Sequence, residues 1–139
     1  MKIMTKKIKL NTKGDTDIIN ITSQVSDALK GTGLKNGTLT VFINGSTAGI
    51  TTVEYEPGLV DDLKAFFEKI APKNGSYEHN NRWHDGNGYA HVRASLLGPD
   101  ISVPFMDGAP RLGTWQQIIF IDFDNRPRSR ELTVQIMGE

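Results

Sequence analysis

The chain has 139 residues, of which 37% are hydrophobic and 23% are charged, a composition that is ordinary for one soluble globular domain. Its 16 basic residues balance 16 acidic residues, and this argues against an uncompensated basic face for nucleic acid or acidic membranes. The absence of cysteine excludes disulfides and thiolate zinc sites, so any zinc would need His, Asp or Glu ligands. No apolar run approaches the roughly twenty residues of a membrane helix, and the first ten residues lack a signal peptide's hydrophobic segment. We therefore expect a cytoplasmic protein that binds neither nucleic acid nor membranes.

The first third of the chain predicts strands around one short helix. Residues 2–10 alternate in part between lysine and apolar residues, which favours an opening strand, and residues 15–22 favour a second short one. A brief helix is then expected from Thr22 or Ser23 to Gly31.

The next segment predicts two strands followed by a long helix. β-Branched and aromatic residues dominate 38–44, and a loop of small residues at 45–49 separates this strand from another at 50–56. Residues 57–72 carry apolar side chains on one helical stripe, with a proline at each end, and predict the long helix.

The last third predicts strands separated by turns that contain Gly, Asp and Pro. These strands are expected at residues 89–97, 100–105, 114–124 and 131–137. The predicted fold is therefore α+β, a mostly antiparallel β-sandwich with one long and one short helix.

All three histidines, His79, His84 and His91, fall between residues 77 and 92. If residues 89–97 form a strand, His91 projects from it on the same face as Tyr89 and Arg93, and the loop before it could return the other two imidazoles to the same point. Three nitrogens and a water are a common catalytic zinc arrangement, with Asp85 and Glu54 as candidate supporting carboxylates. Because the spacing matches no fixed zinc signature, a solvated loop with incidental histidines is an equally good interpretation.

Two other segments offer weaker signals. The loop at 45–49 contains small residues that let backbone N–H groups approach an anion, but a tight turn between two strands is the better interpretation of it by itself, and Ser46 does not fit a nucleophile motif. Arg126, Arg128 and Arg130 would form a phosphate clamp if the chain is extended there, whereas Pro127 favours a turn. Trp115 is expected in the core or at a subunit interface, and Trp83 in a pocket wall.

The motifs "STAGITTVEYEPGLVDDL", "YEH", "AHVRASLLG", "LGTWQQI" and "SRELTVQIMGE", in this order, resemble the YjbQ family, whose members are often labelled secondary thiamine-phosphate synthase enzymes. The resemblance extends over essentially the whole chain and implies a single YjbQ-like domain at residues 1–139. It also implies a homotrimer with a polar site near the subunit boundaries, and weak formation of thiamine phosphate from a pyrimidine pyrophosphate and a thiazole phosphate.

The resemblance carries over a set of functional positions, namely Glu54, Asp62, His79, His91, Gly113, Thr114 and Arg130. The histidines are expected to hold a divalent metal, with zinc the first choice and magnesium the alternative. The phosphate and substrate groups are assigned to Arg130, Gly113, Thr114 and Asp62, and an acid, base or orienting role to Glu54 or Asp85.

One departure from the family concerns the third imidazole. Many relatives carry a histidine where this chain has Gly45, and they lack His84. We expect His84 to replace the missing ligand. Two other functions fit the same residues: a metal-dependent hydrolase, and a non-catalytic trimeric module that binds a small phosphorylated metabolite.

Overall fold

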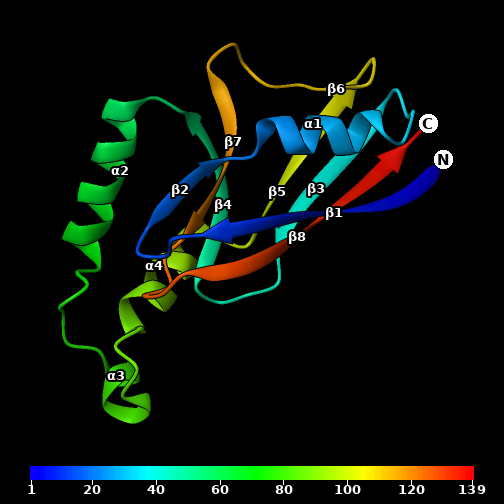
Figure 1. The fold of residues 1–139 in the computed structure, drawn as a ribbon. Helices are drawn as coiled ribbons and strands as arrows, with labels where there is room; N and C mark the ends of the chain where they lie inside the picture. Colours follow the sequence, from blue (N-terminus) through cyan, green and yellow to red (C-terminus); the bar gives the residue numbers. More distant parts are fainter.

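The computed structural model describes all 139 residues and contains two antiparallel sheets and four helices (Figure 1). The first sheet has the order β1 (Lys2–Thr12), β8 (Arg128–Gly138), β3 (Gly37–Ile43), β5 (Asp100–Met106) and β6 (Ala109–Pro110). The second has the order β2 (Asp17–Asn20), β7 (Gln116–Asp122) and β4 (Ala48–Glu54). All strand pairs are antiparallel, so the predicted α+β class with a mostly antiparallel sheet is confirmed.

The main core lies between the two sheets. Leu132, Val134 and Ile136 on β8 are fully buried and alternate with more exposed residues, as the sequence pattern predicts. Helix α1 (Thr22–Lys30) closes this core with the buried side chains of Val25 and Leu29.

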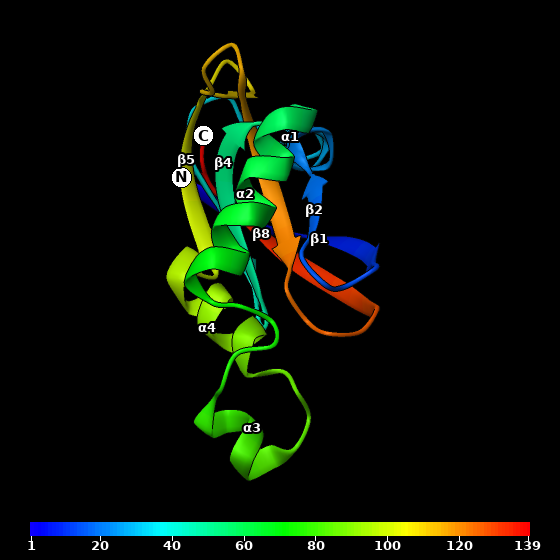
Figure 2. The ribbon, with the colours of Figure 1, turned by 90° about the vertical axis from the view of Figure 1, so that its left-hand side faces the viewer.

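Strand β7 is buried on both faces and joins the main core to a second one. Ile118 and Phe120 belong to the core between the sheets, whereas Ile119 and Ile121 pack with residues from the helices on the other side. The molecule therefore has three layers, and helices α2 (Pro57–Ile70) and α4 (Gly88–Leu97) form the outer one (Figure 2). Helix α3 (Glu78–Trp83) projects beyond the end of these layers (Figure 2). No helix is both long and apolar enough to span a membrane.

The prediction of one long and one short helix is correct for α2 and α1 but misses two others. Residues 89–97, predicted as a strand, belong to helix α4, and part of the predicted histidine loop is helix α3. On α4, Tyr89, Ala90, Arg93 and Ala94 are buried, which is helical spacing. The buried residues recur one helical turn apart and form one stripe, which is the pattern of a helix packed on one side.

Gly49 lets helix α4 lie directly on strand β4. A Cβ at this position would be 2.8 Å from Leu97 Cδ2 and 2.9 Å from the carbonyl oxygen of Gly98. The close approach holds the end of α4 against the start of β4, and the preceding turns of α4 then lie beside the loop that precedes β4, where the candidate site lies.

Candidate functional site

His79 and His91 form a contact pair between two short helices. His79 is the second residue of α3 and His91 the fourth residue of α4, and their ring centroids are 4.4 Å apart with 39° between the ring planes. The prediction that His91 shares a face with Tyr89 and Arg93 is wrong, because residues 89–97 belong to a helix and not to a strand. The side chains of Tyr89 and Arg93 are buried, whereas that of His91 is half-buried.

Asp85 lies next to this pair in the connection between the two helices. Its Oδ1 is 3.4 Å from His79 Nδ1, yet Nδ1 is buried and makes no hydrogen bond. The same carboxylate oxygen accepts a hydrogen bond of 3.1 Å from the backbone N–H of Asn87. Asn125 in turn donates its side-chain amide to the carbonyl of Asp85 at 2.8 Å. These bonds fix the connection to the loop between β7 and β8.

The environment of His91 favours its neutral form. Burial lowers the pKa of His91, and the neighbouring His79 lowers it further, against the smaller opposite effects of Asp85, Asp124 and the backbone of Ser46. A neutral imidazole has a free lone pair, which is the form that binds a metal or accepts a proton.

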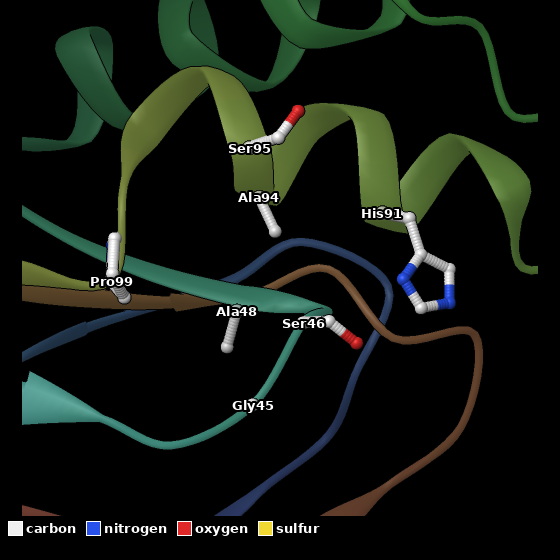
Figure 3. A pocket seen from close by; sticks show the side chains of 7 residues that line it. All are labelled: Gly45, Ser46, Ala48, His91, Ala94, Ser95 and Pro99. Atoms are coloured by element: carbon white, nitrogen blue, oxygen red, sulfur yellow. The ribbon is translucent and has the colours of Figure 1, made fainter.

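A small cavity adjoins His91. It has a volume of about 210 Å³ and lies between α4, from His91 to beyond its end, and the loop before β4. The Ser46 side chain extends toward the His91 ring, and Ala94 faces into the cavity from α4 (Figure 3). The lining is completed by Gly45, Ala48, Ser95 and Pro99. The small residues of the 45–49 loop are therefore part of a cavity wall, although Ser46 shows no hydrogen bond of a nucleophile to a base.

Behind this cavity lies a buried ionic network that the sequence did not predict. Asp124 accepts hydrogen bonds from Thr47 at 3.0 Å and from Asn87 at 3.3 Å, and pairs with Arg128 at 3.2 Å. Burial raises the pKa of Asp124, but the hydrogen bonds from Thr47 and Asn87 and the charge of Arg128 outweigh it and hold the pKa below its usual range. The available sequence signal was the "DFD" that follows the apolar run of β7.

Arg130, predicted to hold phosphate, is part of the same network and uses most of its guanidinium for bonds within the chain. Its Nε donates to Asp122 Oδ2 at 2.8 Å, and its Nη2 donates to Asp122 Oδ1 at 2.9 Å and to Thr47 at 2.8 Å. Only Nη1 has no partner, and it faces Gly45, where an added Cβ would be 3.1 Å away. The three arginines therefore do not act together as a clamp within the protomer. Arg128 and Arg130 pair with the buried carboxylates of Asp124 and Asp122, and Arg126 is exposed.

The donors at this end fit part of a metal site. The His79–His91 pair supplies two imidazoles, and the unpartnered Nδ1 of His79 is the kind of buried polar atom that a cation would satisfy. His84 is exposed and ends α3 with a left-handed backbone, at φ 55°. No group of three or more His, Cys, Asp or Glu side chains is arranged to hold a metal, so one protomer does not assemble the predicted three-histidine set.

The remaining predicted residues lie at the opposite end of the β4–β7 pair. Ala48 pairs with Asp122 at the histidine end, whereas Glu54 pairs with Gln116 at the other. Six residue steps of about 3.3 Å separate the two ends by roughly 20 Å.

Gly113 and Thr114 precede β7 at the Glu54 end and are exposed, as is Asp62 on α2. Trp115 is 71% exposed, which excludes its predicted place in the protomer core, and Trp83 is also exposed. The candidate residues therefore form two groups within one protomer.

Comparisons with known proteins agree with the resemblance seen in the motifs. The profile of the family described as "UPF0047 protein YjbQ-like" matches residues 6–139. A UPF0047 protein of Methanothermobacter thermautotrophicus is 39% identical over 139 residues, covering 100% of this chain and 95% of that protein. The UPF0047 protein YugU of Bacillus subtilis is 34% identical over 137 residues, covering 97% and 100%.

Solved structures show the same fold. A protein of Sulfolobus solfataricus, described as YbjQ-like and of unknown function, is similar to this chain with a TM-score of 0.94 and 33% identity, over 99% of both chains. An uncharacterised YjbQ/UPF0047 protein of Clostridium acetobutylicum has a TM-score of 0.87 and 37% identity, over 95% of this chain and 99% of the other.

Proposed function

Since the chain belongs to the YjbQ-like UPF0047 family, we propose that it is a homotrimeric, metal-dependent transferase with weak activity of the thiamine-phosphate synthase type. In this reaction the thiazole nitrogen forms a bond to the carbon that carries pyrophosphate on the pyrimidine substrate. The C–O bond breaks at the same centre, and pyrophosphate leaves with the bonding electrons. The observation that carries the proposal is the His79–His91 pair beside a cavity, with an unpartnered buried nitrogen.

In this proposal His79 and His91 hold the divalent cation, for which zinc is expected and magnesium is the alternative. The cation would offset the negative charge that develops on the departing pyrophosphate. His91 suits the role because its lowered pKa leaves the imidazole neutral near pH 7. Asp85, whose Oδ1 lies 3.4 Å from His79 Nδ1 without a hydrogen bond, would act as a supporting carboxylate beside the cation. Further ligands would come from water, substrate phosphate, His84 or a neighbouring protomer.

The cavity beside His91 suits one flat ring better than two. Ala48, Ala94 and Pro99 give it apolar walls, and Ser46 adds a hydroxyl group, whereas the Ser95 hydroxyl points away from the cavity and donates to the Val92 carbonyl at 2.8 Å (Figure 3). Its volume of about 210 Å³ is below the range of roughly 300 Å³ and above that is usual for ligand pockets. A site that aligns two substrates therefore needs additional walls.

A neighbouring protomer would supply these walls in a trimer. The Glu54 end of one protomer would then meet the histidine end of the next, which joins two groups that lie roughly 20 Å apart within one chain. Glu54 would act as acid or base there, and Gly113, Thr114 and Asp62 would contact the phosphate groups. Oligomer formation is further supported by large apolar side chains that the protomer leaves exposed, among them Phe66, Ile70 and Leu96.

The role of Arg130 in this proposal is mainly to position the loop at 45–49. Its bonds to Asp122 and Thr47 hold the end of that loop, and only Nη1 is available to approach a phosphate from behind Gly45. We therefore expect Arg130 to influence binding through the loop more than through direct contact.

The test is to incubate the purified protein with the pyrimidine pyrophosphate and the thiazole phosphate, with and without a chelator, and to measure thiamine phosphate by chromatography. We expect product with metal present, and a loss of at least about tenfold on chelation or in His91→Ala. The matched control is Gln117→Ala. Gln117 is a half-buried polar residue like His91, but it lies on β7, and its truncation leaves both histidines intact.

Three results would contradict the synthase assignment. Absence of product under all conditions would exclude it outright. Metal-dependent cleavage of phosphoesters or carboxylate esters without product would identify a hydrolase. Tight binding of a phosphorylated metabolite without turnover would identify a binding module.

A further inference from the structure

A second cavity lies at the Glu54 end of the β4–β7 pair, away from the histidines. Its volume is about 260 Å³, and it is bounded by β4, β5 and the segment that joins β6 to β7. Its polar lining comes from Thr52, Ser102, Arg111 and Gln116, and its apolar lining includes Ile101, Val103 and Leu112. No acidic residue lines it.

Arg111 is the charged group of this cavity, and its guanidinium has no partner within the chain. The ion pairs formed by arginines use Arg93, Arg126, Arg128 and Arg130. The backbone of Arg111 is nevertheless held in place, because its N–H donates to the carbonyl of Pro104 at 2.9 Å. An unpaired guanidinium on a fixed backbone has all of its N–H donors available to a ligand.

Gln116 arranges the other polar groups as donors. Its Oε1 accepts a hydrogen bond of 3.0 Å from the backbone N–H of Gly113, and its Nε2 donates to Thr52 Oγ1 at 3.0 Å. Because the Thr52 hydroxyl is already an acceptor, its own proton is free to donate. Nε2 of Gln116 keeps a second proton, and the Ser102 hydroxyl adds one more donor.

We propose that this cavity is a subsite for a small organic anion, a phosphate ester or a carboxylate. The available polar groups are hydrogen-bond donors with a net positive charge, which is complementary to an oxyanion. Ile101, Val103 and Leu112 would contact the apolar part of the same ligand. No histidine of the same protomer lines the cavity, so binding here needs neither the metal nor the synthase chemistry, even though the proposed trimer would bring the next protomer's histidine end toward it.

Trp115 gives this subsite its own reporter. It is 71% exposed and follows Arg111 by four residues, whereas the other indole, Trp83, is on α3 at the distant end. In a Trp83→Phe background, phenyl phosphate and benzoate are titrated separately while the emission of Trp115 is recorded. Calorimetry with the same two probes measures binding independently of the fluorescence response.

We expect saturable binding that weakens by about 10- to 100-fold in Arg111→Ala, because a hydrogen-bonded charge is removed. Arg82→Ala is the matched control, since Arg82 is also exposed and unpaired but lies on α3, and it should bind as tightly as the parent. Tighter binding of phenyl phosphate would support a phosphate-ester ligand, and comparable binding of benzoate would support the broader class of organic anions.

Absence of saturable binding of both probes would overturn the proposal. Equal loss in Arg82→Ala and Arg111→Ala would also overturn it, because it would show attraction to net charge alone. His91→Ala separates the two proposals: binding should persist in this variant even if synthase activity is lost. Loss of binding in His91→Ala with Arg111→Ala unaffected would place the anion at the histidine end and contradict the inference.

Discussion

Replacing Arg130 with methionine tests whether this arginine stabilises the fold through its ion pair. The guanidinium pairs with Asp122 through two hydrogen bonds of 2.8 and 2.9 Å, and the side chains are only 7% and 0% exposed. Methionine would leave the Asp122 carboxylate buried without its cationic partner, with the Thr12 hydroxyl at 2.7 Å as its remaining side-chain partner. Breaking one side of a buried pair costs about 3–5 kcal/mol.

For a chain of this length, the unfolding entropy converts that loss to a fall in Tm of about 10–17 °C. Thermal and urea unfolding followed by circular dichroism at pH 7, with excess chelator to remove metal effects, measure it. Arg126→Met is the control, because that arginine is largely exposed and should change the free energy of unfolding by about 0.5 kcal/mol or less.

The double variant Asp122→Leu with Arg130→Met should recover much of the lost stability, since no charge is then left unpaired. A loss below about 1 kcal/mol in Arg130→Met would refute the reasoning, because a buried carboxylate without its partner should cost more. If Arg130→Met were that stable and no longer bound phosphate, Arg130 would be a direct ligand-binding residue.

Two further predictions concern the packing and the charge of the site. Gly49→Ala should lower the free energy of unfolding by about 1–3 kcal/mol, because the added Cβ would overlap Leu97 and Gly98. Gly31→Ala is the control and should not lower it, because the nearest atom to the added Cβ is 3.4 Å away. Urea unfolding of the two variants measures the difference. Because Asp124 has a pKa lowered from 3.8, its contribution to stability is fully present above pH 3.8 and is lost as the pH falls through the folded-state value. The stability advantage of the wild type over Asp124→Asn should therefore shrink below about pH 3.8, and an advantage that grows with acid would contradict the assigned shift.

Local patterns predicted the strands well because burial imposes a simple period. The alternation of Leu132, Val134 and Ile136 correctly identified the buried face of β8, and the apolar run of β7 matches a strand buried on both sides. Residues 89–97 were predicted wrongly because Tyr89, His91 and Arg93 also fit a period of two. The competing helical stripe through Ala90 and Ala94 decides the structure, and tertiary packing on β4 makes it favourable.

The candidate site was predicted in composition better than in arrangement. The clustering of histidines predicted that imidazoles would converge, and the rings of His79 and His91 do meet, while no set of three ligands forms. Arg130 could not be assigned from sequence, since its partner Asp122 is buried only once β7 and β8 have folded together. Likewise, the separation of Glu54 from the histidines follows from the register of β4 on β7, which no local pattern reports.

Metal analysis of the purified protein tests the central claim, that His79 and His91 together bind a divalent cation, most directly. Mass spectrometry of metal content after loading with zinc, or with magnesium, would be compared between the wild type, His79→Ala, His91→Ala and His84→Ala. We expect the wild type to retain metal and His79→Ala and His91→Ala each to lose it, while replacing the exposed His84 makes the smallest difference. Full metal content at unchanged affinity in a variant lacking both His79 and His91 would show that these histidines do not bind the cation.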